Sequence, residues 1–143
     1  MKVTKMIVAA AAFGLVCASP VFAADDAMPK DQVKTEKQRI DSEAKAAREK
    51  CKDMKGNQKD ICMAEAKGQE KVAKAELAAK QKDTPKNRYD VAAAKADMEH
   101  SIAREKCDDM KGKEKNQCDK DAKAARDTAK KAAKSEGDAA KKG

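Results

Sequence analysis

The chain has 143 residues and a formal net charge of +8, and 41% of its residues are charged. It contains one Tyr, two Phe and no Trp. Large apolar side chains are so scarce that a thick globular core is excluded. The apolar content is mostly Ala, which favours helix and buries little surface, so we expect slender α-helices.

Residues 1–23 have the pattern of an export signal. Two lysines precede an apolar run over residues 6–16, which is too short to span a bilayer comfortably. Small residues then allow cleavage after Ala23 or after Ala24. We therefore expect a cleaved signal peptide and a periplasmic location. The alternatives are an uncleaved anchor helix and, less favoured by the flanking residues, lipidation of Cys17.

The exported part contains an internal repeat at an offset of 56 residues. Residues 47–67 read AREKCKDMKGNQKDICMAEAK, and residues 103–123 read AREKCDDMKGKEKNQCDKDAK. The match includes Cys, Met and Gly, which are scarce in this chain. It therefore indicates a duplicated structural unit rather than similar composition.

Each copy carries a glycine between two cysteines. Glycine ends helices well because it adopts the left-handed conformation without steric cost. The pattern therefore predicts a helix, a tight turn and an antiparallel helix. On an unbroken helix, the alternative, the two cysteines would lie about 16 Å apart and could not form a disulfide. The turn glycines are Gly56 and Gly112, and the cysteine pairs are Cys51 with Cys62 and Cys107 with Cys118.

The predicted fold class is all-α, with two tandem antiparallel helical hairpins, each clasped by a disulfide. We expect Asn57 to cap the second helix, and Thr84 to cap the third where Pro85 opens it. Gly137 should end the fourth helix. The predicted units are a disordered lead at 24–28, hairpin one at 29–82, a linker at 83–85, hairpin two at 86–136 and a disordered basic tail at 137–143. The predicted helices cover residues 29–55, 57–81, 85–111 and 113–135.

Coiled-coil spacing predicts which residues face a neighbouring helix. We call these positions the seam. Because they are mostly Ala, helices can approach closely but hold each other weakly. In the first helix the seam comprises Val33, Lys37, Ile40, Ala44, Ala47, Cys51 and Met54. In the third it comprises Tyr89, Ala93, Ala96, His100, Ala103, Cys107 and Met110. In the fourth it comprises Cys118, Ala122, Ala125, Ala129 and Ala132.

In an exported chain the four cysteines are expected to form disulfides. The turn geometry favours Cys51–Cys62 and Cys107–Cys118 among the three possible pairings. The Cys-x-x-Cys spacing of redox enzymes and the Cys-x-x-Cys-His motif of haem attachment are absent from the sequence. Zinc sites use closer cysteine spacing. We therefore expect no cofactor, no metal site and no catalytic residues.

Two further residues are candidates for a partner surface. His100, the only His, and Tyr89 lie on the predicted seam of the third helix. The structural reading of His100 is a seam residue in place of Ala44, and a metal ligand or proton carrier is the alternative. The basic C-terminal end could contact an anionic lipid surface. Helices could also self-associate, whereas a nucleic-acid partner is not expected in an exported chain.

With these motifs, the chain resembles small exported Ala/Lys-rich proteins of Gram-negative bacteria. Their units have the form Ala-x-x-x-Cys-x4-Gly-x5-Cys-x3-Ala-Lys, and residues 47–67 and 103–123 match it. Such proteins are often labelled hypothetical exported proteins or cell envelope biogenesis protein TolA. We expect the chain to depart from the TolA label, because the sequence predicts neither a retained membrane anchor nor a recognisable C-terminal domain. The resemblance supplies no active site.

The favoured hypothesis is a non-catalytic periplasmic helical repeat protein that is a structural or interaction element of the cell envelope. The first alternative is a periplasmic stress protein that binds a metal or ligand through the cysteines and His100. The second alternative is a thiol–disulfide redox protein.

Overall fold

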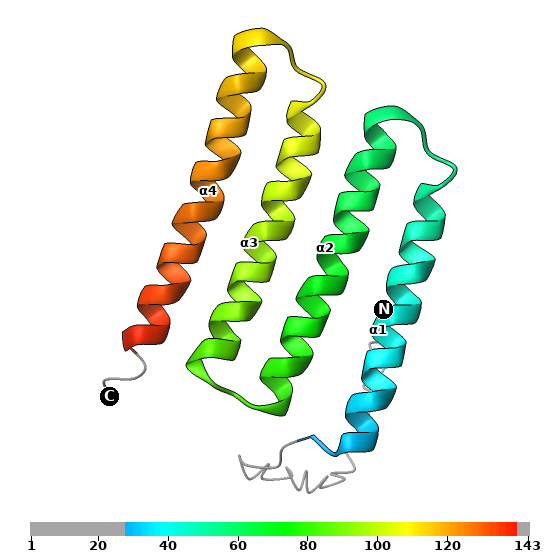
Figure 1. Cartoon of the computed structure of the whole chain (residues 1–143), viewed down its shortest axis with the longest axis vertical. Helices are drawn as coiled ribbons and strands as arrows, with labels where there is room; N and C mark the ends of the chain where they lie inside the picture. The colour runs from blue at the N-terminus through cyan, green and yellow to red at the C-terminus, as the bar shows by residue number, and fades with distance from the viewer. Residues whose placement is uncertain (1–27, 140–143) are drawn as a thin grey trace, which may run out of the picture.

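The computed structural model describes residues 28–139, which form four α-helices and no strand. The helices run alternately up and down (Figure 1). Their bounds are α1 Lys30–Cys51, α2 Gly56–Gln81, α3 Pro85–Cys107 and α4 Gly112–Ala139. The predicted all-α class with two tandem hairpins is confirmed. The predicted signal peptide and most of the predicted lead and tail lie outside the described residues.

The four helices form a single layer. Each helix packs only against the helices next to it in sequence: α1 on α2, α2 on α3 and α3 on α4. Figure 1 shows them side by side in one row, with both disulfide-bearing turns at the same end. The central helices α2 and α3 are therefore covered on two flanks, whereas α1 and α4 each have one neighbour. No part of residues 28–139 covers either broad face of the layer.

The buried part of the layer is thin. Its buried side chains are Ile40, Ala44, Cys51, Ala66, Leu77, Ala96, Cys107 and Ala122. Alanine lets helix axes approach closely, and one contact between α2 and α3 requires a glycine. A Cβ on Gly68 would lie 2.2 Å from Cγ of Met98 and 2.8 Å from its Cβ. The two hairpins are therefore packed on each other through α2 and α3.

The linker between the hairpins forms as the sequence predicts. Thr84 accepts a hydrogen bond from the backbone N–H of Asn87 at 3.0 Å, and Pro85 is the first residue of α3. The Asn87 side chain donates to the carbonyl of Lys82 at 2.7 Å and to that of Ala78 at 3.2 Å. These bonds satisfy carbonyl groups at the end of α2 and couple it to the start of α3.

Several predicted helix boundaries are wrong. α1 and α3 end at their cysteines, four residues before the predicted ends at Lys55 and Lys111. The fourth helix does not end at Gly137, which has no positive φ and lies against Pro85, but continues to Ala139. The first three residues of the predicted disordered tail are therefore helical.

The predicted seam is buried or half-buried along α1 and α3 except at Lys37, Met54 and Met110, which are exposed, and it is wrong along α4. Beyond Ala122, the predicted Ala125, Ala129 and Ala132 are exposed. Arg126 and Lys130 are half-buried instead, because their long aliphatic stems can cover α3 while their charged ends reach water or an acidic partner. The predicted seam of α4 is therefore displaced by one residue, because it was assigned to apolar positions alone.

Polar residues occupy the two free edges of the layer. By the repeat offset, Val72 on the α3-facing side of α2 corresponds to Thr128 on α4, and Ala64 corresponds to Lys120. Likewise Met98 on the α2-facing side of α3 corresponds to Ser42 on α1. Repeat arrays end in units with a polar outer face. The substitutions therefore give the described layer a polar outer flank at each edge.

Candidate functional site

The first candidate site is the clasp of hairpin one, by which we mean its disulfide and turn. Cys51 and Cys62 are bonded, with an S–S distance of 1.95 Å and a Cα–Cα distance of 5.6 Å. Cys51 is the last residue of α1 and is fully buried, whereas Cys62 on α2 is half-buried. The clasp therefore ties an edge helix to a central helix.

The clasp of hairpin two repeats this arrangement. Cys107 at the end of α3 is fully buried and is bonded to the half-buried Cys118 of α4, with Cα atoms 5.7 Å apart. Cys51 and Cys107 are the two largest fully buried side chains of the described residues. The predicted pairing is therefore present in both hairpins, and the disulfides occupy places that a larger apolar side chain would fill in a thicker core.

A glycine makes each tight turn possible. Gly56 and Gly112 both have φ of +58°, a conformation that L side chains adopt at a cost. A Cβ at either position would meet no other atom within 4 Å, so the conformation, and not lack of space, requires glycine there. The predicted turn residues are confirmed, although each glycine begins the following helix instead of ending the preceding one.

The predicted cap at Asn57 is wrong. α2 begins one residue earlier, and Lys55 in the capping position makes no side-chain bond. The side-chain amide of Asn57 is buried with no hydrogen-bond partner among the described residues. The positive φ of Gly56 turns the chain before Asn57, which places Asn57 inside the first helical turn and not in front of it.

The turns also expose two methionines. Met54 is 39% exposed and Met110 is 42% exposed, although the spacing predicts both on the seam. They lie beyond the early ends of α1 and α3, where helical periodicity no longer applies. Met54 borders a shallow groove of about 430 Å³ along α1 and α2, whose floor includes Cys51 and Cys62. The groove therefore runs past the disulfide of hairpin one.

Tyr89 and His100 do not form one site. They are eleven positions apart on α3, which corresponds to about 16 Å along the helix. Tyr89 lines a hollow with Pro85, Lys134 and Gly137, where α3 begins and α4 ends, at the opposite end of these helices from the clasp. His100 is half-buried near Arg126. The predicted partner surface is thus divided between two places on the α3–α4 flank.

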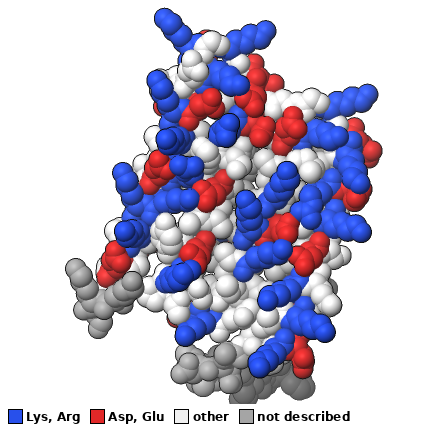
Figure 2. All heavy atoms as spheres, in the orientation of Figure 1, with Lys and Arg blue, Asp and Glu red and all other residues white. Residues whose placement is uncertain are grey.

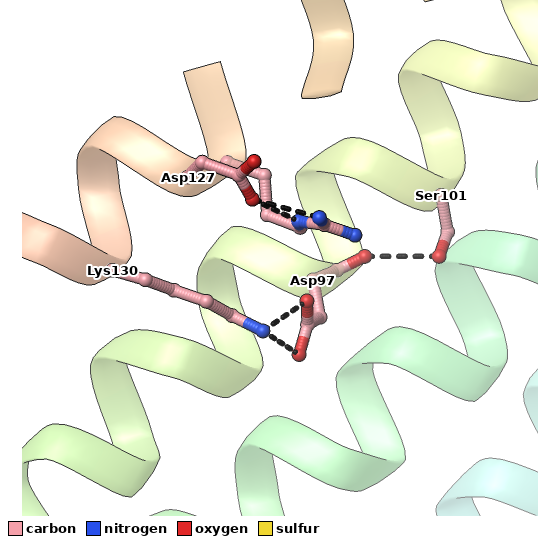
Figure 3. Close-up of polar contacts among 5 residues, drawn as sticks. Asp97, Ser101, Asp127 and Lys130 are labelled. Carbon is pink, nitrogen blue, oxygen red and sulfur yellow. Dashed lines mark hydrogen bonds and ion pairs between the residues drawn. The ribbon is translucent and has the colours of Figure 1, made fainter. Parts of the chain in front are cut away.

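A charged cluster surrounds His100 where α3 meets α4. Lys130 contacts both carboxylate oxygens of Asp97, at 2.7 and 2.8 Å, and Ser101 donates to the Asp97 carbonyl at 2.9 Å (Figure 3). Arg126, the unlabelled residue, binds Asp127 at 2.7 Å. Burial lowers the pKa of His100 below its usual 6.5, and Arg126 and Arg104 lower it further. Asp97 and Asp127 act in the opposite direction, but the net effect of these surroundings is to favour the neutral form of His100.

Sequence reasoning missed this cluster. The predicted seam of the fourth helix, which runs through Ala125 and Ala129, leaves out Arg126 and Lys130. The only signal that could have identified them was their spacing of four residues, in register with Ala122. This spacing places two long basic stems on the flank of α4 that faces the acidic Asp97.

The described residues offer neither a metal site nor a membrane span. No group of three or more His, Cys, Asp or Glu side chains in residues 28–139 is placed to hold a metal ion. Within the same range, no helix is both long enough and apolar enough to cross a membrane. Comparisons with protein-family models, curated proteins and solved structures give no match to this chain.

Proposed function

We propose that this protein is a non-catalytic helical repeat protein of the periplasm that acts as a structural or interaction element of the cell envelope. The observation that carries the proposal is a single layer of helices held by two disulfides, with both broad faces left uncovered by the described residues. A thin layer offers large contact area for its length. It contains little enclosed volume in which a substrate could be surrounded by catalytic groups.

The clasps support the assignment to an oxidising compartment. Disulfides persist outside the cytoplasm, where the thiol-reducing systems are absent. The edge helices have only one packed neighbour each, and a disulfide fixes each of them at one end. A protein built in this way is suited to an oxidising compartment because reduction would release the restraint on both edge helices.

Crosslinking in intact cells tests this function. A photoreactive amino acid is placed at exposed Met54, at exposed Lys95 or at the buried control position Ala66. Cells are then irradiated, and the periplasmic fraction is separated from the cytoplasm. We expect the protein in the periplasm, with crosslinks to an envelope component from exposed positions only. A cytoplasmic location, or the absence of crosslinks from both exposed positions, would contradict the proposal.

Thiol titration separates this function from the metal-binding and redox alternatives. The native protein, carrying Cys17→Ser to remove the one remaining cysteine, should have no reactive thiols and no bound zinc. Four reactive thiols with bound zinc would favour the metal-binding protein. Rapid reduction by catalytic amounts of a thioredoxin-type reductant, coupled to oxidation of a second protein, would favour the redox protein.

A further inference from the structure

The two broad faces of the layer differ in charge. Ion pairs between helices identify one of them: Lys74 of α2 binds Asp41 of α1 at 2.9 Å, and Lys130 of α4 binds Asp97 of α3. A hollow of about 240 Å³ between α2 and α3 opens on this face, with Lys71 and Asp97 in its lining. Lys71 and Lys74 lie on one stripe of α2, so the hollow and both ion pairs are on the same side of the layer. All four helices therefore contribute to this side, which we call the basic face.

Helical spacing from these ion-paired residues gives the other members of the face. Its basic residues are Lys30, Lys34, Lys45, Arg48, Lys52, Lys67, Lys71, Lys74, Lys86, Arg104, Lys123, Arg126, Lys130 and Lys134. Its acidic residues, which are fewer, are Asp31, Asp41, Glu49, Asp60, Glu70, Asp90, Asp97, Glu105, Asp119 and Asp127. Figure 2 shows this face, on which Lys and Arg side chains project from every helix.

The opposite face has the reverse balance. The Lys95–Glu76 pair between α3 and α2, at 2.9 Å, lies on it. Its basic residues are Arg39, Lys50, Lys80, Arg88, Lys95 and Lys106, and its more numerous acidic residues are Glu36, Glu43, Glu65, Glu76, Glu99, Glu114, Asp121 and Glu136. The positive charge of the described residues is therefore concentrated on one side of the layer.

Much of the charge on the basic face is available for a partner. Within the described part of the chain, several of its cations make no ion pair or side-chain hydrogen bond, and all of them are exposed: Lys34, Lys45, Lys67, Lys71, Arg104, Lys123 and Lys134. They are distributed over all four helices. A partner must therefore be anionic across a wide area and not at a single point.

The shape of the face indicates which anionic partner fits. Four helices about 10 Å apart, each 22–28 residues long, make a face about 30–40 Å across in both directions. The described helices leave it open and form no deep groove on it for a strand of nucleic acid. Tyr89, the only aromatic residue among those described, lies on the α4-facing flank and supplies no stacking platform. A flat anionic surface fits this geometry better.

We propose that the basic face docks on a bilayer surface rich in anionic phospholipid. The inference rests on the proposed function and specifies its partner. Each Lys or Arg near an anionic bilayer strengthens binding by roughly fivefold, and the effect decays within a Debye length of about 10 Å at 0.1 M salt. Because the layer is flat, its unpaired cations can all lie within that distance of the bilayer surface at the same time.

Vesicle sedimentation with the full oxidised chain tests the proposal. Binding is measured to vesicles containing phosphatidylglycerol and to vesicles of phosphatidylcholine alone. The test variant is Lys67→Glu/Lys71→Glu/Lys123→Glu on the basic face. The matched control is Lys50→Glu/Lys80→Glu/Lys106→Glu on the opposite face, which changes the net charge equally and also uses exposed residues without ion pairs. Circular dichroism verifies that both variants remain helical.

We expect salt-sensitive binding to the phosphatidylglycerol vesicles only. The test variant should lose on the order of 100-fold in affinity, and the control less than about tenfold. Equal losses in the two variants, equal binding to phosphatidylcholine, absence of binding, or equally tight binding of a single-stranded oligonucleotide would each overturn the proposal. A crosslinked envelope protein without vesicle binding would overturn this inference and leave the proposed function standing.

Discussion

The clasps should stabilise the edge helices far more than the centre of the layer. α1 contacts only α2, and its own buried side chains are Ile40, Ala44 and Cys51. Removing the first disulfide with Cys51→Ser/Cys62→Ser opens a loop of about 12 residues. In the chain-entropy model this costs about 3 kcal/mol, which corresponds to roughly 150-fold in an opening equilibrium.

Hydrogen exchange followed by mass spectrometry measures this effect helix by helix. In the variant, amides of α1 should exchange on the order of 100-fold faster than in the intact protein, whereas α3 and α4 should keep their protection. The matched variant Cys107→Ser/Cys118→Ser should accelerate exchange in α4 instead. Unchanged protection of α1, or an equal loss across all four helices, would refute the view that each clasp retains one edge helix.

Three other perturbations test separate parts of the structure. Gly68→Ala should lower the free energy of unfolding by about 1–3 kcal/mol, because the added Cβ would overlap Met98. Gly137→Ala should be neutral or stabilising. Urea denaturation of both variants gives the comparison, and equal effects would contradict the close approach of α2 and α3 at Gly68. Because burial lowers the pKa of His100, unfolding takes up a proton below about pH 6.5. Between pH 7.5 and 5.5 the melting temperature should therefore fall further in the intact protein than in the His100→Gln variant. Identical melting profiles in the two proteins would refute the burial argument. Lys120→Ala/Thr128→Val/Lys131→Ala gives the edge of α4 the residues that α2 presents to α3. Light scattering should therefore detect more self-association than in the unmodified chain, and a variant that associates no more strongly would contradict the role of the polar edges.

The features that the sequence predicted correctly are those with a local physical cause. The repeat aligned Cys51 with Cys107, glycine marked each turn, and Thr84 preceded Pro85 in a capping sequence. Each of these depends on a few adjacent residues whose conformational preferences are strong. The hairpins and the cysteine pairing followed from them.

The features that were missed depend on tertiary packing. The α4 flank that contacts α3 includes Arg126 and Lys130 because the thin layer leaves their charged ends within reach of water. Asn57 had the composition of a cap, but the turn geometry at Gly56 displaced it. The charge difference between the faces appears only when the four helices are set side by side, since both signs alternate along each helix.

The pairing of the cysteines is the foundation of this account, and non-reducing peptide mapping tests it directly. Trypsin can cleave between the two cysteines of each hairpin at lysines in the intervening segments. Mass spectrometry of the digest should find Cys51 linked to Cys62 and Cys107 linked to Cys118, with each link lost on reduction. A dominant peptide linking Cys51 to Cys107 would contradict the clasped hairpin.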